Sequence, residues 1–305
     1  MESGSRSPEP EGFLVEIVPG ERIHFLDWGG PAVAHAGSWP VLLVHGLNAT
    51  AWAWAAVARR LRGSVPTVAI DLRGHGLSDA PTSGYTEGQL GEDLVAVAEG
   101  SGLFAGPVGK VVLAGHGYGA IVAAWGAGRL KDRCAGVVLV DGGWQDVAAE
   151  TGMTPDEWLR ELEEPPGVFS SMAAYLADRR DFDPASWDAD QEQAARNAVV
   201  EVPAGKVVPA VRPHALAASV EALFSYRPRV TLAHLAIPVT VLLAGTEDPA
   251  GRRAALDAID RLRAEAGLGA LRRIDLSTAG HNLLRYRPAE VSHAILALAR
   301  EPADR

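Results

Sequence analysis

A glycine-rich turn, Gly115-His116-Gly117-Tyr118-Gly119, is the feature that most constrains the fold of this chain. The apolar run 110–114 that precedes the turn is typical of a buried strand, and the run 120–125 that follows it is typical of a helix. A strand that enters a helix through so short a turn predicts a β–α unit, and such units build mostly parallel sheets. The middle residue of the turn, Gly117, has no side chain.

Elsewhere along the chain, short β-branched or leucine-rich runs alternate with alanine-rich amphipathic stretches, which favours an α/β fold. The expected strands are 13–18, 21–27, 40–44, 67–71, 109–114, 136–141, 238–244 and 271–276. The expected helices are 50–62, 87–101, 118–130, 250–266 and 288–300. Residues 144–236 break the alternation, because their helical patches are interrupted by prolines and they contain no convincing core strand.

Five further segments have a recognisable order. They are His45-Gly46-Leu47-Asn48 after a strand, the D-x-R-G-x-G-x-S pattern of 71–78, the strand 137–141, the strand 238–244 with the loop to Asp248, and Ala279-Gly280-His281-Asn282. With the glycine turn, they make the chain similar to the α/β-hydrolase superfamily from about Phe13 to Arg300. The resemblance implies a mostly parallel central sheet flanked by helices, with an inserted helical cap.

The same resemblance divides the chain. It implies a core of residues 12–143 and 237–300, and a helical cap of residues 144–236 over the active site. Residues 1–11 are polar with two prolines, so we expect a flexible tail and not a signal peptide, and residues 301–305 form a second tail.

Composition limits the class of partner. The net charge is −10 and no block is rich in lysine or arginine, so we expect no nucleic-acid binding. The uncharged run 111–128 contains five glycines and changes from β-rich to helical, which argues against a membrane span. The single cysteine, Cys134, excludes an internal disulfide and favours a reducing compartment, so we expect a cytoplasmic protein. The partner that the resemblance implies is a small-molecule substrate or ligand. The sequence leaves the oligomeric state open.

The resemblance also implies a catalytic arrangement. In this family a G-x-S-x-G turn, the nucleophile elbow, carries a serine, a later histidine takes its proton, and a carboxylate orients the histidine. Here Gly117 stands in the serine position, while Asp248 and His281 follow in family order as acid and base. Glu247 and Asp141 are the alternative acids. No histidine or cysteine spacing is typical of zinc, so we expect neither a metal nor a cofactor.

Other site residues follow from the resemblance. The backbone N–H groups of Leu47 and Tyr118 are expected to form the oxyanion hole, the pair of donors that stabilises a developing negative charge. His45, which should brace the oxyanion turn, is grouped with His116 and Trp144 as a substrate-binding residue. Aromatic residues in the cap and near Trp144 favour an apolar cleft for a neutral hydrophobic ligand.

The absent side chain at Gly117 leaves three hypotheses. The protein could act on a small neutral hydrophobic ester, lactone or carbonyl compound through a His–Asp dyad without a serine nucleophile. It would then be a hydrolase of the carboxylic-ester class, or a lyase or isomerase that needs no cofactor. It could instead bind a small ligand without catalysis, or be a serine hydrolase inactivated by glycine at the elbow, naturally or by engineering.

Overall fold

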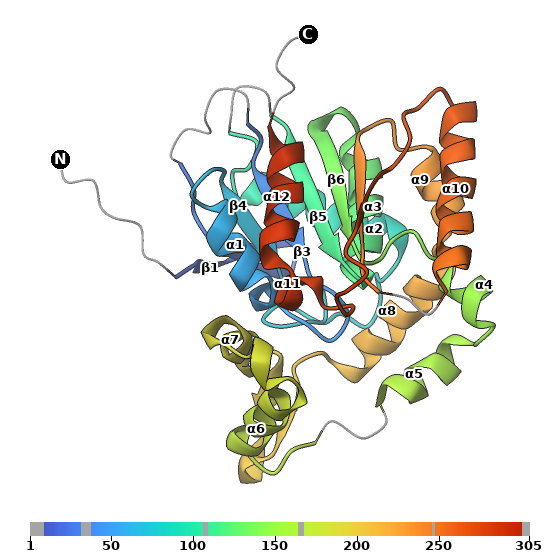
Figure 1. Cartoon of the computed structure of the whole chain (residues 1–305). Coiled ribbons are helices and arrows are strands. Elements are labelled where there is room, and N and C mark those ends of the chain that lie inside the picture. Colours follow the sequence, from blue (N-terminus) through green and yellow to red (C-terminus); the bar gives the residue numbers. More distant parts are fainter. Residues whose placement is uncertain (1–8, 32–37, 106–108, 164–167, 246–247, 301–305) are drawn as a thin grey trace, which may run out of the picture.

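An eight-stranded sheet forms the centre of the molecule in the computed structural model (Figure 1), which describes residues 9–31, 38–105, 109–163, 168–245 and 248–300. The strand order is β1-β2-β4-β3-β5-β6-β9-β10. The first two strands form an antiparallel hairpin and β2 also pairs antiparallel with β4, whereas all later pairs are parallel. The strands are β1 Glu11–Val18, β2 Glu21–Asp27, β3 Val41–Val44, β4 Thr67–Ile70, β5 Val111–His116, β6 Cys134–Val140, β9 Val239–Leu243 and β10 Arg272–Asp275.

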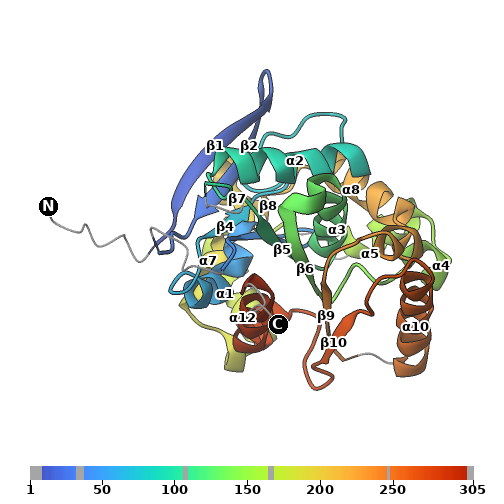
Figure 2. The ribbon, with the colours of Figure 1, turned by 90° about the horizontal axis from the view of Figure 1, so that it is seen from above.

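Helices cover both faces of this sheet (Figure 2). One hydrophobic cluster joins one face to α2 (Glu87–Gly100), α3 (Tyr118–Leu130) and α10 (Pro249–Glu265). A second cluster joins the other face to α1 (Ala55–Leu61) and α12 (Pro288–Ala299). The predicted α/β class with a mostly parallel sheet is therefore confirmed.

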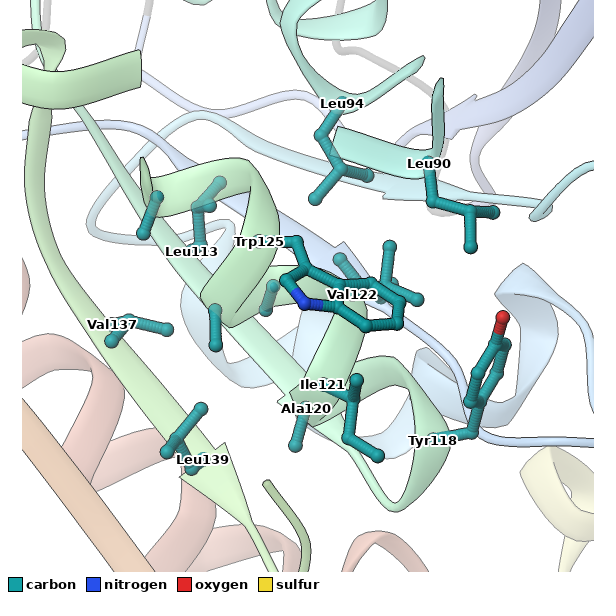
Figure 3. Close-up of a cluster of buried hydrophobic side chains, with 14 of the residues drawn as sticks. Leu90, Leu94, Leu113, Tyr118, Ala120, Ile121, Val122, Trp125, Val137 and Leu139 are labelled. Carbon is teal, nitrogen blue, oxygen red and sulfur yellow. The ribbon is translucent and has the colours of Figure 1, made fainter. Parts of the chain in front are cut away.

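The packing of α3 fixes where β5 ends. Trp125 and Val122 of α3 lie among Leu90 and Leu94 of α2 and Leu113 of β5, all buried (Figure 3). Because α3 packs against α2 and the sheet through these side chains, the turn from β5 into α3 is held at the carboxyl edge of the sheet. Sites of α/β proteins form at that edge.

The segment between β6 and β9 is mostly helical. It contains α4 (Val147–Thr151), α5 (Pro155–Glu163), α6 (Met172–Phe182), α7 (Ala189–Asn197), α8 (Pro213–Ser225) and α9 (Pro228–Ala233), with three-residue 3-10 helices η3 (Pro184–Ser186) and η4 (Pro203–Gly205). It also holds two short antiparallel strands outside the main sheet, β7 (Val199–Glu201) and β8 (Val207–Pro209), which the sequence did not predict.

The two halves of this segment pack differently. Buried residues of α8, such as Leu216, Val220 and Phe224, belong to the main hydrophobic cluster. The helices α6 and α7 lie beyond the sheet (Figure 1), and α7 contacts α1 and the 3-10 helix η1 (Ala51–Trp54). An ion pair of 2.9 Å between Arg59 and Asp190 joins α1 to α7. The division into a core of 12–143 and 237–300 and a cap of 144–236 stays a prediction.

No helix among the described residues is long and apolar enough to cross a membrane. The uncharged run 111–128 forms β5 and most of α3. Of the expected amino-terminal tail, residues 1–8 lie outside the described residues and β1 begins at Glu11. The tail expected at 301–305 also lies outside them.

Candidate active site

Gly117 joins β5 to α3 in a conformation that few other residues adopt. Its φ is 55° and its ψ is −118°, and glycine adopts a positive φ at little cost because it has no Cβ. Its N–H donates to the carbonyl of Val140 at 3.0 Å, and its carbonyl accepts from the N–H of Ala120 at 3.1 Å. A Cβ placed on Gly117 would lie 3.4 Å from Nε2 of His281 and 3.6 Å from its Cε1. The missing side chain would thus point at the imidazole.

The backbone around this turn approaches other segments so closely that only glycine fits. A Cβ on Gly115 would lie 2.0 Å from the carbonyl oxygen of Gly119, and a Cβ on Gly119 would lie 2.3 Å from the carbonyl oxygen of His45. A Cβ on Gly142, after β6, would lie 2.4 Å from the carbonyl oxygen of Gly117. These approaches pack the ends of β3, β5 and β6 against one another.

His281 is held by Asp141. Oδ2 of Asp141 accepts a hydrogen bond from Nδ1 of His281 at 2.6 Å, which leaves Nε2 directed toward Gly117. Asp141 directly follows β6 and has a φ of 45°. Its other oxygen accepts from the N–H of Ala244 at 2.8 Å, and its own N–H donates to the carbonyl of Leu242 at 2.9 Å. The carboxylate is 14% exposed and the imidazole 63%, so Asp141 is fixed and His281 is accessible.

The expected pairing of Asp248 with His281 is corrected by this geometry. Oδ1 of Asp248 accepts from the N–H of Gly251 at 2.8 Å and caps the first turn of α10, a role for which aspartate is strongly preferred. The carboxylate on Nδ1 comes from Asp141, which had been only an alternative. The sequence signal was the position of Asp141, directly after the strand beside β5. The other alternative, Glu247, lies outside the described residues.

The two backbone N–H groups expected to form the oxyanion hole, a role that stays a prediction, belong to turns at the carboxyl edge of the sheet. Tyr118 is the first residue of α3, and the first N–H groups of a helix have no partner within it. Leu47 lies in the turn in which the N–H of Ala49 donates to the carbonyl of Gly46 at 3.3 Å. The next residue, Asn48, has a φ of 58°. Both turns start at the carboxyl edge of the sheet, at β5 and at β3.

His45 is a support for this turn and not a substrate contact. It is fully buried. Its Nδ1 donates to the carbonyl of Gly46 at 2.7 Å and its Nε2 accepts from the N–H of Leu72 at 3.0 Å. Because Nε2 accepts while Nδ1 donates, the ring is neutral, and burial lowers its pKa in keeping with this. The assignment of His45 to substrate binding is therefore wrong, because no side-chain surface is left for a ligand.

His116 lies against His281. Its Nε2 donates to the carbonyl of His281 at 3.1 Å, and the two ring centroids are 4.8 Å apart. Burial, and then the neighbouring His281, lower the pKa of His116 to about 4. A neutral His116 is thus packed beside the more exposed imidazole.

Trp144 follows β6, as expected, but it is 7% exposed and belongs to the main hydrophobic cluster. Its indole N–H is buried without a hydrogen-bond partner among the described residues. Cys134 begins β6, at the opposite end of that strand from Asp141. Burial raises the pKa of its thiol to about 12. Over the described ranges, no group of three or more His, Cys, Asp or Glu side chains could hold a metal ion.

Comparison with known proteins places this geometry in a family. The model of the alpha/beta hydrolase family matches residues 41–294. The 2-(acetamidomethylene)succinate hydrolase of Mesorhizobium japonicum is 31% identical over 110 residues, which are 36% of this chain and 38% of that protein. The N-formylmaleamate deformylase of Pseudomonas putida is 34% identical over 123 residues, 40% of this chain and 42% of the relative. The chain thus aligns with less than half the length of these relatives.

Solved structures match over nearly the whole chain. The crystal structure of E-2-(acetamidomethylene)succinate hydrolase has a TM-score of 0.73 at 21% identity, covering 95% of this chain and 98% of the other. The thioesterase domain from the curacin biosynthetic pathway has a TM-score of 0.71 at 21% identity, covering 94% and 99%. At such identities these likenesses show the fold alone. The family model spans most of the chain, and the protein belongs to the alpha/beta hydrolase family.

Proposed function

We propose that this protein is a hydrolase-like enzyme in which His281, oriented by Asp141, acts as a general base without an acyl-enzyme at residue 117. The observation that carries the proposal is that Nε2 of His281 points at Gly117, 3.4 Å from the position of the absent Cβ, while Asp141 holds Nδ1 at 2.6 Å. A module that only binds a ligand has no need of a carboxylate that aligns an accessible imidazole.

The chemistry uses the space that the missing side chain leaves. A water molecule beside Gly117 gives a proton to Nε2 as its oxygen attacks the carbonyl carbon of an ester or lactone, and Asp141 stabilises the imidazolium. The N–H groups of Leu47 and Tyr118 stabilise the oxyanion. When the intermediate collapses, the carbon–oxygen bond to the leaving group breaks and His281 returns the proton to the alcohol. With a carbonyl substrate, His281 can instead remove a proton from the α carbon while the same N–H groups stabilise the enolate. Return of this proton to another carbon completes an isomerisation, and breaking of the bond from the β carbon to a leaving group, which takes up the proton, completes a lyase reaction.

The substrate class that we propose is a small acyl or carbonyl compound. By their names, the two curated relatives act on small compounds that carry an acetamido or a formyl group. Because those relatives align with only part of this chain, we transfer the reaction type, hydrolysis of an acyl group, and not their substrates.

One observation favours the alternative hypothesis, a serine hydrolase inactivated by glycine at residue 117. Within the part of the chain that the structure describes, and apart from the chain neighbours, only atoms of the His281 ring lie within 4 Å of a Cβ at residue 117. A serine there would therefore fit, and its hydroxyl would be within reach of Nε2. The structure of the site would be the same if a serine enzyme had lost its nucleophile.

The experiment compares the chain as it stands with Gly117→Ser and His281→Ala on p-nitrophenyl acetate and on a panel of small esters and lactones. The proposal predicts slow turnover without a burst, no labelling by serine-directed phosphonates, and loss of turnover in His281→Ala. A large esterase activity that appears only in Gly117→Ser would identify an inactivated serine hydrolase. Saturable ligand binding, with no turnover that either change affects, would identify a binding protein.

A further inference from the structure

A cavity lies beside the loop that leads to His281. Its volume is about 400 Å³, within the range of small-molecule sites. One wall is formed by Asp183, Ala185 and Ser186 at η3, and the other by residues 278–280 and 285–287. Ala279 and Gly280, directly before His281, are among its lining residues, whereas His281 and Gly117 are not.

Two arginine side chains line the cavity in fixed positions. Nε of Arg285 donates to Oγ of Ser186 at 2.6 Å, and its Nη2 donates to the carbonyl of Asp183 at 2.7 Å. In Arg287, Nη2 donates to Oγ1 of Thr278 at 3.2 Å and Nη1 donates to the carbonyl of Tyr286 at 3.3 Å. These acceptors are neutral, so they orient the guanidinium groups without cancelling their charge.

Carboxylates near the cavity neutralise the positive charge of Arg285 and Arg287 only in part. The oxygens of Asp183 accept from the N–H of Ala185 at 3.2 Å and from the hydroxyl of Ser186 at 2.7 Å. The hydrogen bond from Ser186 is the main reason why the pKa of Asp183 is lowered. Glu290 lies 3.9 Å from Nε of Arg287, at the edge of ion-pair range. The charge of Arg285 also lowers the pKa of Asp183, so Asp183 offsets part of that charge. Among the lining residues, two guanidinium groups face this one carboxylate.

We propose that this cavity binds a small organic anion through a carboxylate group, with Arg285 and Arg287 as its ligands. Guanidinium groups match the geometry of a carboxylate with paired N–H donors, and such charge-assisted hydrogen bonds are the strong ones. Anchoring by Ser186 and Thr278 reduces the side-chain entropy that binding would otherwise cost. An anion here would also join η3 to the loop at Gly280, next to His281.

The test is calorimetric titration of the whole chain with succinate as the probe, at low ionic strength. We expect saturable binding that salt weakens. Arg287→Gln should raise the dissociation constant roughly 10- to 100-fold, since a hydrogen bond to a charged group contributes about 1.5–3 kcal/mol. Arg287→Lys should raise the dissociation constant less than Arg287→Gln does. The matched control is Arg253→Gln, at an exposed position of α10, which should change the dissociation constant less than about twofold.

Arg285→Gln repeats the test at the second ligand. If that variant folds poorly because Arg285 ties η3 to α11 (Leu283–Tyr286), Arg287→Gln still decides. Binding of inorganic phosphate but not of succinate would overturn the carboxylate assignment. Absence of saturable binding by either anion, or equal loss in Arg253→Gln, would overturn the site. The titration needs no turnover, so its outcome is independent of the function proposed for His281.

Discussion

The carboxylate of Asp141 accepts a hydrogen bond from Nδ1 of His281 at 2.6 Å across 140 residues of sequence. The strand order explains the contact, because β6 lies between β5 and β9 in the sheet. Asp141 directly follows β6, beside the turn at Gly117. The loop before His281 is tied to the residues after β9 by the hydrogen bond from Gly245 N–H to the carbonyl of Ala279 at 2.8 Å. The dyad therefore spans neighbouring strands.

The first prediction separates the two candidate acids. Asp141→Asn should lower turnover about 10³- to 10⁴-fold, since an amide no longer fixes the tautomer or stabilises the imidazolium. Asp248→Asn is the matched control, because asparagine caps a helix as well as aspartate and α10 should be kept. Steady-state rates of both variants on p-nitrophenyl acetate, with circular dichroism to verify folding, provide the measurement. A large loss in Asp248→Asn with little loss in Asp141→Asn would contradict the pairing.

The second prediction concerns the space at residue 117. Gly117→Ala should destabilise the fold by about 1–3 kcal/mol, because a Cβ is strained at this backbone conformation. It should also lower turnover, since its methyl group takes the position of the attacking water. Urea unfolding and ester hydrolysis measure the two effects.

Gly117→Ser is the control for strain, because it has the same Cβ and adds a hydroxyl. The two variants should unfold at similar urea concentrations and differ in their burst with activated esters. Unchanged turnover in Gly117→Ala would contradict a water at this position.

The strands of the sheet could be predicted from the sequence, because buried strands are short, continuous runs of apolar residues. The strand expected at 109–114 is β5, Val111–His116, and the helix expected at 118–130 is α3 with the same bounds. The three-residue strands β7 and β8 have too few residues to show an alternating pattern.

The acid could not be chosen from the sequence. Asp141 and Asp248 both follow a strand at the same edge of the sheet, and their order along the chain fits equally well. The choice depends on side-chain direction. Asp248 faces the first turn of α10, whereas Asp141, at a φ of 45°, faces the His281 loop. The sequence predicted that His45 braces the oxyanion turn, and its hydrogen bonds to Gly46 and Leu72 agree with that role. Its grouping with the substrate-binding residues is corrected by its complete burial, which the motif does not specify.

The third prediction concerns His116 as a residue that positions His281. His116→Phe keeps an aromatic ring for packing but removes the hydrogen-bond donor to the carbonyl of His281. It should therefore lower kcat by a larger factor than it changes KM. The loss of one neutral hydrogen bond should cost about 1 kcal/mol of stability. His116→Gln, whose amide can replace Nε2 as donor, should retain more of the rate. Equal rates in both variants would show that the hydrogen bond does not position the base.

The last prediction concerns stability at low pH. His75 is buried, donates from Nδ1 to the carbonyl of Arg73 at 3.1 Å, and has no partner on Nε2 among the described residues. Burial, and then the neighbouring His45, lower the pKa of His75 to about 3. In the unfolded chain a histidine has a pKa of about 6.5. Between these two pKa values the unfolded state therefore binds more protons than the folded state. The contribution of neutral His75 to the free energy of unfolding is fully present above about pH 6.5 and is lost as the pH falls toward 3.

His75→Asn removes this titration and keeps a donor for the carbonyl of Arg73. Compared with it, the unchanged chain should lose stability more steeply below pH 6.5, by up to about 1.4 kcal/mol for each pH unit. The measurement is urea unfolding of both proteins at pH values between 7 and the onset of acid unfolding, with His293→Asn, exposed on α12, as the matched control. The buried His45, whose pKa is also lowered, adds a slope of the same sign to both proteins, so only the difference between them reports on His75. Parallel curves for the unchanged chain and His75→Asn would mean that His75 is not held neutral by its burial.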